Sequence, residues 1–237
     1  MTVISAKDIV VDFPIYGLRS RSLKNAVIRA ATGGMLARDA EERVVVRALD
    51  GVSFEFREGD RVGIVGHNGS GKTTLLRVIA GAYEPVSGSI ETQGRIASML
   101  SITLGIDPEA TGYENIFLRA AIMGLKPREV AAMVSEIREF SGLGEYIDMP
   151  VRMYSSGMSM RLAFAISTCM AADIILMDEW LSVGDPDFRE KAQQRLRRLV
   201  DRASILVLAS NDERLVRDNC NRIMRLSHGK MTALETI

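Results

Sequence analysis

The segment that most constrains this chain is a stretch of glycines and small polar residues, Gly66-His67-Asn68-Gly69-Ser70-Gly71-Lys72-Thr73. Its spacing is glycine, four residues, glycine, lysine, then serine or threonine. The apolar run 61–65 precedes it, and apolar residues at helical spacing follow over 73–80, so the stretch joins a strand to a helix. Glycines let backbone N–H groups close around an anion, and the helix start adds its positive dipole end. We therefore predict a phosphate-binding loop.

The residue types in this loop indicate a nucleotide with a metal ion. Lys72 is expected to reach the β- and γ-phosphates, and Thr73 to hold Mg²⁺. A second element supplies acid, because the apolar run 174–177 ends in Asp178 and Glu179. Asp178 is predicted to orient the magnesium shell, and Glu179 to polarise the attacking water as a general base. The alternative is an acidic pair that only caps the following turn.

The remaining patterns are typical of a layered α/β fold. Apolar stretches at 3–11 and 52–56 indicate two strands of one sheet, and the runs 174–177, 204–208 and 222–226 alternate with a charged helix at 188–201. Such alternation indicates parallel strands with helical crossovers. We predict a single domain over 1–237: a core at 1–94 and 161–237 that carries the phosphate loop, with a mostly parallel sheet and an N-terminal antiparallel β portion, and an inserted helical subdomain at 95–160.

A basic insert occupies residues 17–43. Arginines and a lysine are concentrated there, and Leu23, Val27 and Ala31 stand at helical spacing, which predicts a basic amphipathic helix. Two interpretations stay open: a solvated surface helix that packs its apolar stripe on the core, or a helix lying against anionic lipid or a membrane partner.

Composition excludes several classes of protein. Lys plus Arg number 30 and Asp plus Glu number 30, so the formal charge is zero and no global field favours nucleic acid. The longest nearly apolar run, 162–172, is shorter than the ~20 residues that span a bilayer, and residues 1–8 have no export-signal pattern. We expect a cytoplasmic chain that binds no nucleic acid.

The cysteines and histidines number two each and are widely separated, without metal-ligand spacing. Structural zinc and a disulfide framework are therefore not expected. Cys169 and Cys220 are predicted to be small buried apolar residues.

A further loop changes how the phosphate loop and the acidic strand end are interpreted. Tyr154-Ser155-Ser156-Gly157-Met158 opens a helix and exposes unpaired N–H groups to an anion. Alone it would be an ordinary helix cap. With a phosphate loop before it and an acidic strand end after it, the chain resembles the nucleotide-binding subunit of an ABC transporter over about residues 4–231.

The resemblance implies a homodimer in which two copies sandwich two ATP molecules head to tail. Ser155 and the Gly157 amide would contact the γ-phosphate held by the other copy's Lys72, and the loop 182–185 would cross the interface. An integral membrane permease subunit is the implied partner, with the chain peripheral on the cytoplasmic face of the inner membrane. The implied ATP-contacting residues are Gly66, His67, Asn68, Gly69, Ser70, Gly71, Lys72, Thr73, Thr74, Ser155 and Gly157.

Within that family the chain is similar to exporters of polysaccharides such as O-antigen, capsule and teichoic acid. Tyr-Ser-Ser-Gly-Met in place of Leu-Ser-Gly-Gly-Gln, the fragments at 107–116 and 180–185, and the basic insert carry this resemblance. It implies an ATPase that moves a cell-surface polysaccharide or its lipid-linked precursor, with the glycan contacted only indirectly. Phe13 or Tyr16 is a candidate to stack on adenine, or simply to pack. The alternatives are another cargo such as a lipid or drug, an ABC ATPase acting on the ribosome or DNA, and a weakly hydrolysing regulatory module.

Two positions depart from the family pattern. Asn211 stands where a histidine is usual; it can hydrogen-bond a γ-phosphate but cannot carry a proton, which predicts slower hydrolysis than in relatives. Ser101 stands near the position of a metal-reaching glutamine and has a shorter reach. It either meets Mg²⁺ through water, or coupling runs through Glu114 and the helical subdomain, or the loop is an unspecialised surface.

Overall fold

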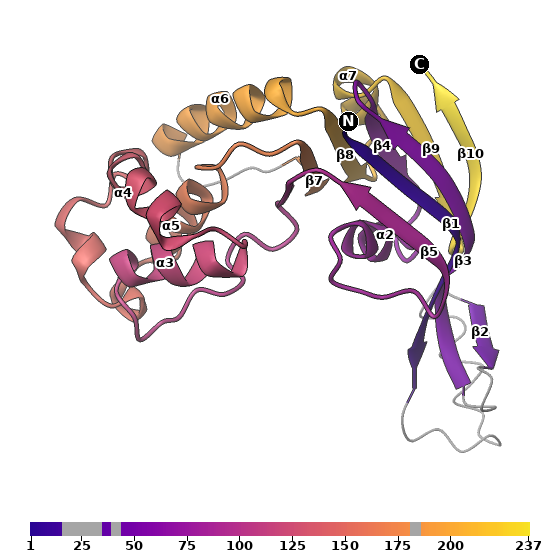
Figure 1. The fold of residues 1–237 in the computed structure, drawn as a ribbon, viewed down its shortest axis with the longest axis horizontal. Helices are drawn as coiled ribbons and strands as arrows, with labels where there is room; N and C mark the ends of the chain where they lie inside the picture. The colour runs from indigo at the N-terminus through magenta and orange to yellow at the C-terminus, as the bar shows by residue number, and fades with distance from the viewer. Residues whose placement is uncertain (16–34, 39–43, 181–185) are drawn as a thin grey trace. The chain divides into compact units, whose positions relative to one another are not determined.

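The computed structural model describes residues 1–15, 35–38, 44–180 and 186–237, which form two compact units (Figure 1). The first unit comprises residues 1–96, 176–180 and 204–237. The second comprises 97–175 and the described part of 181–203. The α/β fold class is as predicted, but the units divide the chain differently from the expected boundaries at 94/95 and 160/161.

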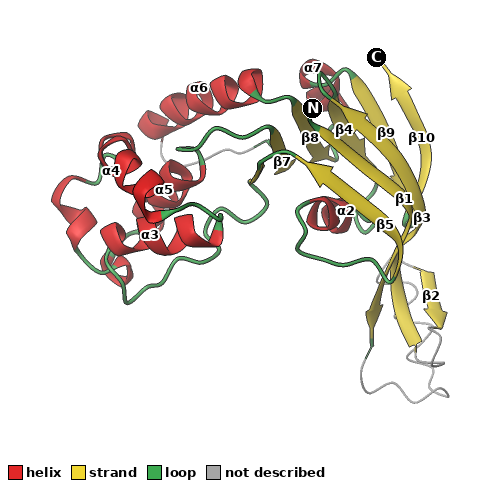
Figure 2. Cartoon of the chain, in the orientation of Figure 1, coloured by secondary structure: helices red, strands yellow, loops and turns green. Residues whose placement is uncertain are grey.

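The smaller sheet of the first unit is antiparallel. It contains β1 (Val3–Pro14), β2 (Met35–Arg38), β3 (Val44–Arg57) and β5 (Ser87–Gln93) in the order β2-β3-β1-β5 (Figure 2). Ile4 pairs with Phe56 and Ile9 with Val52, and all four side chains are buried. Ile4 and Ile9 are an odd number of residues apart, and the register shift between Ala6 and Ile9 lets both side chains be buried. The prediction that the two N-terminal runs are strands of one sheet is confirmed.

The larger sheet carries the phosphate loop. In the first unit its order is β10-β9-β4-β8-β7, with β4 (Arg61–Val65) parallel to both β8 (Ile205–Ser210) and β9 (Arg222–Ser227). β7 (Ile174–Asp178) follows β8, and β10 (Lys230–Thr236) is antiparallel to β9. The helices α2 (Lys72–Ile79) and α7 (Glu213–Asn219) follow β4 and β8. Strands β4, β7 and β8 are apolar and buried almost throughout, as expected for strands covered on both faces.

The second unit is mainly helical. It contains α3 (Gly112–Ile122), α4 (Pro127–Ser141), α5 (Ser156–Ser167) and α6 (Pro186–Arg202), the short helices Gly144–Asp148 and Val151–Met153, and most of β6 (Ile96–Ser98). A capping box begins α3: the Thr111 side chain accepts from the Glu114 amide, and the Glu114 carboxylate accepts from the Thr111 amide. These hydrogen bonds lower the pKa of Glu114. Gly142, with φ 64°, ends α4.

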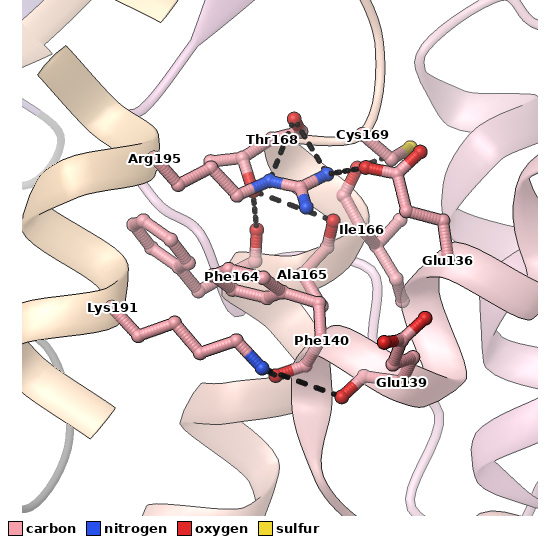
Figure 3. Close-up of polar contacts among 10 residues, drawn as sticks. All are labelled: Glu136, Glu139, Phe140, Phe164, Ala165, Ile166, Thr168, Cys169, Lys191 and Arg195. Atoms are coloured by element: carbon pink, nitrogen blue, oxygen red, sulfur yellow. Dashed lines mark hydrogen bonds and ion pairs between the residues drawn. The ribbon is translucent and has the colours of Figure 1, made fainter. Parts of the chain in front are cut away.

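Helix α6 is attached to the C-terminal ends of α4 and α5 (Figure 3). Lys191 donates to the Phe140 carbonyl at 3.2 Å, and Arg195 donates twice to the Thr168 carbonyl, at 3.1 and 3.2 Å. Both cations lie over the Phe140 ring, and Arg195 also pairs with Glu136 at 2.7 Å. Helix ends leave carbonyls without intrahelical partners, and these cations satisfy them. Residues 161–175 and α6 therefore pack with the helices, whereas the sequence placed them in the core that carries the phosphate loop.

The described part of the basic insert is a strand. Met35 and Arg38 pair with Arg47 and Val44, so β2 forms the edge of the smaller sheet. The helix predicted around Leu23, Val27 and Ala31 lies outside the described residues. The sequence pattern did not indicate this strand. Its four residues form a strand only because they pair with the free edge of β3. No helix in the described parts of the chain has both the length and the apolarity needed to cross a membrane.

Candidate nucleotide-binding site

The loop between β4 and α2 is pressed closely against neighbouring backbone. Gly71 has φ 107°, and a Cβ added there would lie 2.7 Å from the Ala48 carbonyl oxygen of β3. A Cβ on Gly66 would collide with the Leu226 carbonyl oxygen of β9. The Ser70 carbonyl accepts from the Gly229 amide at 3.0 Å. Glycine is therefore required at both ends of the loop, and the loop wraps the N-terminus of α2.

The Lys72 side chain turns back into this loop. Its ammonium donates to the carbonyl oxygens of Gly66 at 2.7 Å and His67 at 3.1 Å, and to Oδ1 of Asn211 at 2.8 Å. Asn211 Nδ2 in turn donates to Asn68 Oδ1 at 2.8 Å. The sequence predicted roles for these residues separately, and the structure joins them in one network.

The acidic end of β7 lies at the same place. Asp178 Oδ2 accepts from the Thr73 hydroxyl at 2.6 Å, so two oxygen groups from different elements converge. Glu179 is exposed, its amide donates to the Ala209 carbonyl at 2.8 Å, and it has φ 73°. Such a backbone conformation is rare for a residue with a side chain and is found at functional sites. Burial lowers the pKa of Lys72, and the charges of Asp178 and Glu179 oppose that shift.

These groups line one cavity of about 520 Å³ in the first unit. Predicted residues on its wall are Asn68, Gly69, Gly71, Lys72, Thr73, Thr74, Asp178, Glu179 and Asn211. Sequence reasoning missed Val46, Arg47, Ala48 and Ser210. Arg47 is held by Asp12 at 2.9 Å, and this hydrogen bond and charge raise its pKa. No motif marks the three β3 residues, because only the close approach of β3 to Gly71 brings them here.

The other predicted site residues are placed as follows. Phe13 is 37% exposed and its ring meets Tyr83 edge-on at 5.4 Å, while Tyr16 and the loop 182–185 lie outside the described residues. Ser155 is the N-cap of α5 and accepts from the Met158 amide at 3.2 Å. Ser155, Gly157 and Ser101 belong to the second unit, and their contacts with a nucleotide stay predictions.

The arrangement has the chemistry of a site for a phosphate chain. Backbone N–H groups at the start of α2 and the Lys72 ammonium offer donors and positive charge. Thr73 and Asp178 offer the oxygen ligands that Mg²⁺ prefers, and Mg²⁺ commonly takes only one or two such protein ligands beside phosphates and water. The residues present therefore fit a magnesium nucleotide.

A strand, a glycine-rich loop, a helix and a second strand of the same sheet that ends in acid define a phosphate-loop nucleotide-binding cassette. Solved structures share this fold. A dimeric ATP-binding cassette bound to ADP and phosphate in a post-hydrolysis state matches with TM-score 0.68 and 20% identity, covering 98% of each chain. A dimeric bacterial ABC transporter cassette matches with TM-score 0.67 at the same identity and coverage.

The ABC transporter family model matches residues 49–182. An O-antigen export system ATP-binding protein, RfbE of Yersinia enterocolitica, is 44% identical over 97% of this chain and 96% of its own length. RfbB of Klebsiella pneumoniae, of the same description, is 34% identical over 97% and 92%. The teichoic acids export ATP-binding protein TagH of Lactococcus lactis is 39% identical, over 78% of this chain and 40% of its own length. The chain belongs to the ABC transporter family, and the predicted resemblance to ATP-binding proteins of polysaccharide export is confirmed.

Proposed function

We propose that this chain is the ATP-hydrolysing subunit of an exporter that moves a cell-surface polysaccharide, or its lipid-linked precursor, across the inner membrane. The observation that supports ATP hydrolysis is that Lys72, Asp178 and Glu179 line the same cavity. The cargo is inferred from relatives named for O-antigen and teichoic acid export.

The residues of the cavity divide the chemistry among them. Thr73 and Asp178 would hold Mg²⁺, which when bound offsets the negative charge of the phosphates. Lys72 places its positive charge at the terminal phosphates. Glu179 accepts a hydrogen bond, and then the proton, from the water whose oxygen attacks the γ-phosphorus as the bond to ADP breaks. Asn211 donates an N–H to the γ-phosphate without exchanging a proton.

A homodimer would complete each site. Ser155 caps α5, and the first N–H groups of that helix have no intrahelical partners. In the proposed dimer these groups face the γ-phosphate held by the other copy. Solved dimeric cassettes of the same fold support this arrangement.

The second unit offers a surface for a membrane permease subunit, with the chain peripheral on the cytoplasmic face. A largely apolar groove there is lined by Asp107, Glu109, Ala110, Tyr113, Glu114, Phe117, Leu118, Ala121, Leu125, Pro127 and Val130. Beside it, buried Arg119 donates to the Leu104 carbonyl and, at 2.7 Å, to the Ser167 hydroxyl. Arg119 thus ties the turn after Ser101 to the end of α5. This supports coupling through the helical unit, with Ser101 near Mg²⁺ as the alternative.

The test is Mg-ATP hydrolysis by the purified chain as a function of its own concentration, with Lys72→Ala as control. Turnover that rises more steeply than linearly, and is lost in the control, supports composite sites between two copies. Because Asn211 carries no proton, a weakly hydrolysing regulatory module is the second candidate. ATP binding without turnover, alone and with the permease present, would favour that candidate.

The cargo requires a cellular experiment. Deletion of the gene should remove a polysaccharide from the cell surface and leave its lipid-linked precursor inside. The wild-type gene should restore export, and the Lys72→Ala gene should not. An unchanged surface polysaccharide would instead favour a lipid or drug as cargo.

A further inference from the structure

The hydrogen-bonding capacity of Lys72 is fully used. An ammonium group has three N–H donors and no acceptor. Its three acceptors are the carbonyl oxygens of Gly66 and His67 and the side-chain oxygen of Asn211. A phosphate oxygen that binds Lys72 must therefore replace one of them. The two carbonyls are backbone of the loop, whereas Asn211 meets Lys72 through a side chain that can rotate.

The orientation of the Asn211 amide is fixed by its two neighbours. Because Lys72 can only donate, Asn211 must turn its oxygen toward the ammonium. Its nitrogen then faces Asn68, whose side-chain oxygen accepts at 2.8 Å. Lys72 therefore sets which end of the Asn211 amide faces it, and Asn68 holds the other end in place.

We propose that Asn68 is a positioning residue that holds Asn211 in competition with a terminal phosphate for Lys72. Phosphate oxygens only accept, so the group that Asn211 can offer a phosphate is its nitrogen, which lies against Asn68. Entry of the terminal phosphate and reorientation of the Asn211 amide are then a single exchange of hydrogen bonds. Neither amide titrates, so the exchange needs no proton. The inference rests on the proposed binding of ATP.

The test is a double-mutant cycle on the full chain, in a Glu179→Gln background that prevents turnover. Asn68→Ala, Asn211→Ala and the double variant are compared for affinity toward Mg-ATP and Mg-ADP, measured by competition with a fluorescent ATP analogue. Asn68→Ala removes one of the two hydrogen bonds that hold the amide, so ATP should bind about fivefold more tightly, the effect of one net hydrogen bond. In the Asn211→Ala background the same change should alter ATP affinity less than about twofold.

Affinity for ADP provides the matched comparison. ADP lacks the phosphate that would face Asn211, so Asn68→Ala should change its affinity less than that of ATP. Thermal unfolding of each variant checks that the loop change leaves the fold intact. An equal effect of Asn68→Ala in both backgrounds, or on both nucleotides, would show that Asn68 acts through the loop itself and would overturn the inference.

Failure of the proposed function gives a different result. If ATP binds no more tightly to the parent chain than to Lys72→Ala, the site is not a nucleotide site and both proposals fall. If ATP binds and the cycle is additive, only the role of Asn68 falls.

Discussion

In both units, cationic side chains donate hydrogen bonds to backbone carbonyls, but the two sets of hydrogen bonds differ in how readily they can be exchanged. In the first unit Lys72 donates to two loop carbonyls and to the side-chain amide of Asn211, and Lys72 and Asn211 both line the cavity. In the second, Lys191 and Arg195 reach the ends of α4 and α5 while both cover the Phe140 ring. A cation such as Lys72, one of whose acceptors is an exchangeable side chain, is suited to binding a ligand. Cations such as Lys191 and Arg195, whose acceptors are backbone carbonyls and whose charge lies over an aromatic ring, are suited to stabilising the fold.

The largest expected effect is on turnover in the first unit. Glu179→Gln keeps the shape of the side chain but removes the proton acceptor, so kcat should fall about 10²- to 10⁴-fold. ATP affinity should stay within a few-fold, since Lys72 and the loop are intact. Steady-state hydrolysis and nucleotide titration measure the two quantities. Unchanged turnover would remove Glu179 from the chemistry.

The reactivity of the two cysteine thiols, one in each unit, allows the two units to be compared directly. Burial raises the pKa of Cys169 in the second unit to about 11, and that of Cys220 in the first to about 12. Each thiolate is therefore scarce at pH 8, and alkylation should be at least about 100-fold slower than in the unfolded chain, where the pKa is near its ordinary value. Mass spectrometry of iodoacetamide adducts over pH 7–9 checks this. Rapid modification of Cys169 alone would show that the helical unit opens locally.

Arg195→Ala tests whether the second unit depends on its cations. The change removes two hydrogen bonds to Thr168, the pair with Glu136 and a ring contact, so unfolding free energy should fall by about 2 kcal/mol. Arg197→Ala, at an exposed position of the same helix, should cost less than about 0.5 kcal/mol. Chemical denaturation of both variants gives the comparison. Equal losses would mean that the contacts contribute nothing specific.

The smallest change is expected from Asn211→His. A ring that can carry a proton restores a charged donor toward the γ-phosphate, so turnover should rise a few-fold. The rise should be larger below about pH 6.5, where more of the histidine is protonated. A pH profile of kcat for both proteins measures it. No increase at any pH would count against the placing of Asn211 at the position where a histidine is usual in the family.

Sequence predicted the groups that a local pattern of residues marks. The phosphate loop, Asp178 and Glu179 were identified because a motif or a buried strand marks each of them. Arg47 and the Asn68–Asn211 contact were not, since Arg47 reaches the loop from β3, and Asn211, which follows β8, is 143 residues from Asn68 along the chain. The attachment of α6 was missed for a related reason: the sequence indicated a charged helix at 188–201, but not that its cations would reach Phe140 and Thr168.

The backbone of Glu179 has a consequence for how the chain can change over time. With φ 73°, this position favours glycine, and a residue with a side chain costs about 1 kcal/mol or more there. Glu179→Gly should therefore raise the unfolding temperature while abolishing hydrolysis. Selection for greater stability and selection for hydrolysis thus oppose each other at this residue. The rise in unfolding temperature of the Glu179→Gly variant would measure the size of this conflict.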